Sequence, residues 1–86
     1  MNKQLLSTLA NPIRLKLLCC LSRGAKNVTQ LIENCSLSQS AVSQHLARLK
    51  TVGLVNTTRV GKVIIYELKN EQVGAMANQL AQFVDV

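Results

Sequence analysis

The stretch that decides the fold is residues 27–54, NVTQLIENCSLSQSAVSQHLARLKTVGL. It contains two apolar patterns with helical spacing, separated by the turn Cys35-Ser36-Leu37. The first helix is expected from Asn27, which opens a capping box, to Asn34. The second is expected from its cap at Ser38 to Val52, with Gly53 as a left-handed ending. Two short helices joined by such a turn predict a helix-turn-helix.

The flanking segments complete a small domain around this unit. Two helices are expected upstream, over about Asn2–Ala10 and Pro12–Ser22, and the second is apolar on most sides and therefore central. Downstream, the period changes to two over Leu54–Arg59 and Lys62–Leu68, which predicts a hairpin. A last helix follows over Glu71–Phe83. Residues 1–86 are thus one domain, mainly α with a β-hairpin wing, in the order of a winged helix-turn-helix.

The second helix of the pair has the composition of a recognition helix. Its core positions are Ala41, Val42, Leu46 and Leu49. The segment 38–52 contains no acidic residue, although glutamate is a strong helix former. Short polar side chains allow close approach to bases and phosphates, and glutamine pairs with adenine through two hydrogen bonds. The expected DNA contacts on this helix are Ser38, Gln39, Ser40, Ser43, Gln44, His45, Arg48 and Lys50.

The charge balance supports a polyanionic partner. Ten Lys and Arg against four Asp and Glu give a formal net charge of +6. Arg59 and Lys62, at the tip of the expected wing, extend the basic edge and are expected to contact phosphates. Duplex DNA is the expected partner, because the A-form major groove of RNA does not admit a helix of this kind.

Several classes of function are disfavoured. No signal peptide and no apolar run of membrane-spanning length is present, which predicts a cytoplasmic protein with no membrane contact and with reduced thiols. No motif pairs a cysteine with a base, so no enzyme is expected, and no cofactor or metal site is predicted. A protein-interaction module is the alternative. It would carry acids or large apolar groups on the face of residues 38–50, where neither occurs.

Three segments resemble the ArsR/SmtB family of repressors: residues 37–55 with the recognition helix and its exit, residues 9–15 (LANPIRL), and residues 61–68 (GKVIIYEL). The resemblance implies a winged-helix homodimer that binds a pseudopalindromic operator and represses. It also implies pairing through the first and last helices. The interface residues expected from their apolar stripes are Leu5, Leu6, Leu9, Met76, Leu80 and Phe83.

The cysteines resemble those of one subgroup of that family. Cys19 matches a second-helix cysteine of the sulfide- and redox-responsive, HlyU/BigR-like members, in which it pairs with a cysteine in the last helix. The last helix here has none, and the ligand patterns of the metal-responsive members are missing. The candidate sensor thiols are Cys19, Cys20 and Cys35. The routes open to them are a Cys19–Cys35 or Cys20–Cys35 disulfide, a persulfide on one thiol, or a disulfide between subunits. Simple packing of these cysteines, with no inducer, is the competing interpretation.

Overall fold

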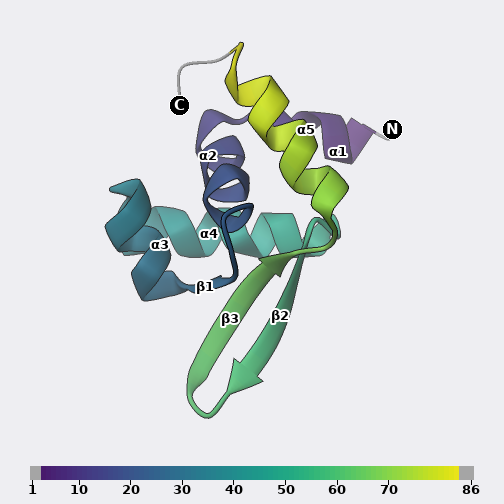
Figure 1. The fold of residues 1–86 in the computed structure, drawn as a ribbon. Coiled ribbons are helices and arrows are strands. Elements are labelled where there is room, and N and C mark those ends of the chain that lie inside the picture. Colours follow the sequence, from purple (N-terminus) through teal and green to yellow (C-terminus); the bar gives the residue numbers. More distant parts are fainter. Residues whose placement is uncertain (1–2, 84–86) are drawn as a thin grey trace.

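The computed structural model describes residues 3–83. Within them, four helices pack together around a fifth, central helix, and a β-hairpin projects away from them (Figure 1). The elements are α1 (Lys3–Leu9), α2 (Pro12–Leu21), β1 (Lys26–Asn27), α3 (Val28–Cys35), α4 (Gln39–Thr51), β2 (Val55–Val60), β3 (Val63–Leu68) and α5 (Glu71–Ala81). This order confirms the winged helix-turn-helix predicted from the sequence. Helices α3 and α4 are the helix-turn-helix, and β2 and β3 are the wing.

Local capping signals set the helix starts. Asn11 accepts from the backbone N–H groups of α2, and Asn70 accepts from that of Val73 at the start of α5. Asn27 and Gln30 form the predicted capping box, with bonds of 2.8 and 2.9 Å. These side chains satisfy donors that a helix start leaves without intrahelical partners. The starts of α2, α3 and α5 are therefore where the sequence predicts them.

The helix ends differ by a few residues. Helix α3 retains Cys35, which the sequence analysis placed in the turn, because the chain reverses only at Ser36, with φ of 55°. Helix α2 ends at Leu21 and α5 at Ala81, each short of its expected end. The expected start of the first helix at Asn2 lies outside the described residues.

The end of α4 confirms its predicted glycine ending. Gly53 has a φ of 80°, its N–H bonds to the carbonyl of Lys50, and the N–H of Leu54 bonds to the carbonyl of Leu49 at 3.0 Å. This pair of bonds is a Schellman ending, which satisfies carbonyls that the helix leaves free. It turns the chain directly from α4 into the wing.

The hairpin is part of a three-stranded antiparallel sheet with the order β1-β3-β2. Its register runs from Val55 opposite Leu68 to Val60 opposite Val63, so the turn lies one residue later than predicted. Gly61 adopts the left-handed conformation that this tight turn requires, with φ of 63°. Strand β1 was not predicted, because a strand of two residues is defined by its partner β3 and not by its own pattern.

Helix α2 lies at the centre of the domain, as its apolar composition predicts. Leu17 and Leu18 are fully buried, and the helix contacts α1, α3, α4 and α5. The core consists of aliphatic side chains and two cysteines: Leu9, Leu15, Leu17, Leu18, Cys20, Leu21, Leu31, Cys35, Val42, Leu46, Leu49, Leu54, Val55, Val73 and Ala77. The recognition helix is thus fixed on a packed base.

Candidate nucleic-acid interface

Helix α4 divides into a buried and an exposed face, as its pattern predicts. Val42, Leu46 and Leu49 are fully buried. The exposed side chains include Gln39, Ser40, Ser43, Gln44, Ala47, Arg48 and Lys50, and no acid is among them. The glutamines and serines among them can both donate and accept hydrogen bonds, and they are held on a helix at helical spacing. Such a surface suits the base edges of a major groove.

The start of α4 is arranged for an anion. The side chain of Ser38 accepts a hydrogen bond from the N–H of Ala41 at 3.1 Å, which confirms its predicted role as the cap. A hydroxyl that accepts this bond still has its own proton to donate. Ser38 and the exposed Ser40 thus place two hydroxyl donors at the positive end of the helix dipole.

The wing carries two cations at its tip. The hairpin projects away from the helices (Figure 1), and Arg59, Val60 and Lys62 at its end are all exposed. Nε of Arg59 donates to the carbonyl oxygen of Gly61 at 3.1 Å, which holds the guanidinium across the turn. The side chain of Lys62 has no hydrogen-bond or ion-pair partner within residues 3–83, so its ammonium group is free for a phosphate.

His45 is held differently from the other expected contacts. It is half-buried, and its Nδ1 accepts a hydrogen bond from Nε of Arg14 on α2, at 3.3 Å. Burial, and to a smaller extent the charge of Arg14, lowers the pKa of His45 below its usual value. Arg14 was not predicted as part of this region, because no local sequence pattern relates two residues that are 31 positions apart.

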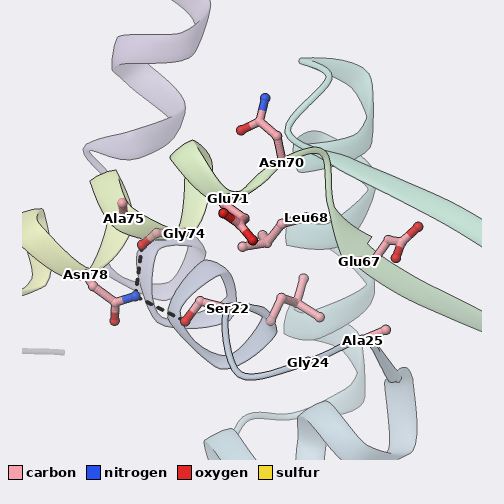
Figure 2. Close-up of a pocket in the computed structure, with 11 residues that line it drawn as sticks. Ser22, Gly24, Ala25, Glu67, Leu68, Asn70, Glu71, Gly74, Ala75 and Asn78 are labelled. Carbon is pink, nitrogen blue, oxygen red and sulfur yellow. Dashed lines mark hydrogen bonds between the residues drawn. The ribbon is translucent and has the colours of Figure 1, made fainter.

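A polar cavity of about 530 Å³ lies between α2, β3 and α5 (Figure 2). Nδ2 of Asn78 bridges Oγ of Ser22 and the carbonyl of Gly74, at 3.1 and 2.9 Å. A Cβ on Gly74 would come within 3.0 Å of the Ser22 and Leu68 side chains, so glycine permits the close packing of α5 on α2. Glu67 and Glu71 line this cavity, which makes it an unfavourable surface for DNA.

The expected dimer residues divide between core and surface. Leu6, Leu80 and Phe83 are exposed by 63%, 37% and 84% of their surface. Leu5 and Met76 pack half-buried against the core. Leu9 is 5% exposed and belongs to the core of its own chain, which corrects its placement on an exposed stripe. The sequence shows that one face of α1 is apolar. It does not show which residues of that face pack inside the domain and which remain on its surface.

The structure brings two of the three cysteines together. Cys20 on α2 and Cys35 on α3 are both buried, and the Cys20 thiol is near enough to affect the pKa of Cys35. Burial first, and then the neighbouring Cys20 thiol, raise the pKa of Cys35 to about 12. Cys19 is half-buried, and burial raises its pKa against an opposing effect of Arg23. All three are free thiols, and a raised pKa keeps a thiol protonated and weakly nucleophilic.

Among residues 3–83, no group of three or more His, Cys, Asp or Glu side chains is placed to hold a metal ion. None of the helices there has the length and apolar character needed to cross a bilayer.

A projecting hairpin beside an acid-free recognition helix defines a winged-helix DNA-binding protein. Comparison with known proteins supports the same class of protein. The family model for bacterial regulatory proteins of the arsR family matches residues 11–57. The chain belongs to the ArsR family, and within it groups with HlyU- and BigR-like members. It is therefore a sequence-specific DNA-binding transcription regulator.

Individual relatives are similar over most of their length. The chain is 43% identical over 76 residues to the transcriptional activator HlyU of Vibrio cholerae, covering 88% of this chain and 70% of the relative. The structure of HlyU from Vibrio vulnificus matches with a TM-score of 0.80 and 42% identity, over 93% of this chain and 83% of the other. The repressor BigR from Xylella fastidiosa matches with a TM-score of 0.83 and 34% identity, over 96% and 85%.

Proposed function

We propose that two copies of the chain form a two-fold dimer that binds a pseudopalindromic operator and represses the adjacent gene. The observation that carries the dimer is the exposure of three large apolar side chains, Leu6 on α1 and Leu80 and Phe83 near the end of α5. Leu80 and Phe83 also line an apolar cavity of about 150 Å³ with the end of α1 and the start of α2. A chain this short buries only a small core and leaves these apolar side chains in water. A second copy of the chain would cover them.

Each dimer would then present two recognition helices to one face of the duplex. The two exposed α4 faces would enter successive major grooves, about 34 Å apart, and each wing would bring Arg59 and Lys62 to flanking phosphates. Within α4, Gln39, Ser43 and Gln44 read bases, whereas the remaining expected contacts on the helix hold phosphates. Repression is proposed because the resemblance to ArsR/SmtB repressors implies it and the relative BigR is named a repressor.

The proposed role is binding in the cytoplasm, without catalysis. The thiols of Cys20 and Cys35 are buried, and the raised pKa of Cys35 opposes a role as a nucleophile. The imidazole of His45, which a thiol or serine nucleophile would need as a base, is engaged with Arg14.

The test combines selection of DNA with measurement of stoichiometry. Duplexes are selected from a randomised pool, and sedimentation gives the number of chains bound to each selected duplex. We expect two chains per duplex and a selected sequence with two inverted half-sites, centred about one helical turn apart. A single chain on an asymmetric site would contradict the proposed dimer, and recovery of no preferred sequence would contradict the operator.

A thiol response is a second proposal, favoured by the neighbouring buried thiols Cys20 and Cys35. A hydroperoxide would take two electrons and two protons from the pair, forming one S–S bond and yielding water and an alcohol. The bond would tie α2 to α3, the first helix of the helix-turn-helix. The high pKa of Cys35 predicts a slow reaction, because little thiolate is present near neutral pH.

A further inference from the structure

An arginine from outside the helix-turn-helix reaches the recognition helix. The bond from Nε of Arg14 to Nδ1 of His45 joins the first turn of α2 to the middle of α4. Both side chains are half-buried, so the contact is partly shielded from water. Capping by Asn11 fixes the backbone N–H of Arg14 itself, at 3.2 Å, so the arginine starts from a rigid position.

The chemistry of this bond fixes the proton of His45. A guanidinium group donates hydrogen bonds and cannot accept them, so Nδ1 must be the acceptor and cannot carry a proton. A neutral imidazole then has its proton on Nε2. A protonated imidazole has no acceptor nitrogen and would lose the bond, and the charge of Arg14 opposes that form further.

The other ring nitrogen is open to a partner. Among the described residues, every buried side-chain nitrogen or oxygen has a hydrogen-bond partner, and the ring of His45 has one such bond there, from Arg14. Nε2 of the half-buried His45 therefore reaches solvent. Its neighbours on α4, Gln44 and Arg48, are exposed on the face assigned to DNA. The ring thus presents one N–H donor at the margin of that face.

We propose that Arg14 is a positioning residue of the DNA interface, which fixes His45 as the tautomer whose Nε2–H donates to a DNA phosphate. A phosphate oxygen fits this place better than a base does. His45 lies at the margin between the exposed and the buried face of α4, beside the exposed Gln44, and the nearby guanidinium of Arg14 adds positive potential that favours a phosphate. The inference rests on the proposed role of α4 in DNA contact.

The first experiment needs no DNA. Nitrogen-15 NMR of the single histidine in the native protein, near neutral pH, distinguishes the two neutral tautomers and the protonated ring. We expect the Nε2–H tautomer to predominate, to persist in Lys16→Met, and to give way to a mixture in Arg14→Met. Lys16 is the matched control, because it is a half-buried cation of the same helix. A proton on Nδ1 in the native protein would overturn the proposal, even if Arg14→Met failed to fold.

The second experiment measures binding to a labelled duplex of about 30 base pairs, long enough for two half-sites. Arg14→Met is expected to weaken binding about fivefold more than Lys16→Met does. In a His45→Ala background, Arg14→Met should cost no more than Lys16→Met. Equal costs of Arg14→Met in both backgrounds would show that the arginine acts through its own charge, and would overturn the proposal. If the native protein binds no DNA, the proposed function fails and the tautomer result stands.

Discussion

Lys62 provides the sharpest test of how the wing contributes. Its ammonium group is exposed at the tip of the hairpin and has no partner within the described residues, so replacement by alanine removes a charge without breaking a contact in the domain. Each phosphate neutralised in duplex DNA contributes about 0.9 to the slope of log affinity against log salt concentration. A dimer of the Lys62→Ala variant lacks two such charges, so its slope should be smaller by about 1.8.

The effect on affinity follows from that slope. Between about 1 M and 0.1 M salt, the native protein should gain roughly sixtyfold more affinity than Lys62→Ala, on specific and random duplexes alike. Fluorescence anisotropy titrations at a series of salt concentrations measure both slopes. Lys69→Ala is the control, since Lys69 is exposed but directly follows β3 at the base of the hairpin. An unchanged slope for Lys62→Ala, or an equal decrease for Lys69→Ala, would refute wing-tip contact with phosphates.

The remaining predictions concern the dimer, pH and redox response. Leu6→Ser with Phe83→Ser should raise the dimer dissociation constant at least about thirtyfold, measured by sedimentation, and an unchanged constant would exclude this surface. The folded-state pKa of His45 is lowered, so the unfolded chain binds its proton first. The contribution of the neutral His45 to the free energy of unfolding should therefore be fully present above pH about 6.5 and decrease as the pH falls below that value. The variant His45→Asn should not show this decrease. Peroxide should weaken DNA binding in the native protein but not in Cys20→Ser or Cys35→Ser, and equal weakening in all three would assign the effect elsewhere.

The features that the sequence predicted correctly are those fixed by neighbouring residues. The capping box at Asn27, the cap at Ser38 and the left-handed Gly53 each depend on a few adjacent positions. The buried face of α4 follows from helical spacing, and its acid-free opposite face is visible in the residue types alone.

The features that the sequence could not predict depend on contacts between distant segments. Strand β1 exists because β3 pairs with it, and Arg14 meets His45 only when α2 packs beside α4. The burial of Leu9 depends on how α1 meets the core. Composition left two cysteine pairings open within the chain, and only the packing of α2 on α3 favours Cys20 with Cys35.

The central claim is that the exposed face of α4 determines which DNA sequence the protein binds. The most direct measurement is the ratio of affinities for a selected duplex and a random duplex, for the native protein and for Ser43→Ala with Gln44→Ala. The native ratio should reach about a thousandfold or more, and each lost base contact should reduce it by the equivalent of about 1–3 kcal/mol. Affinity for the random duplex should stay nearly constant. A variant that loses affinity equally for both duplexes, with its ratio intact, would contradict the account.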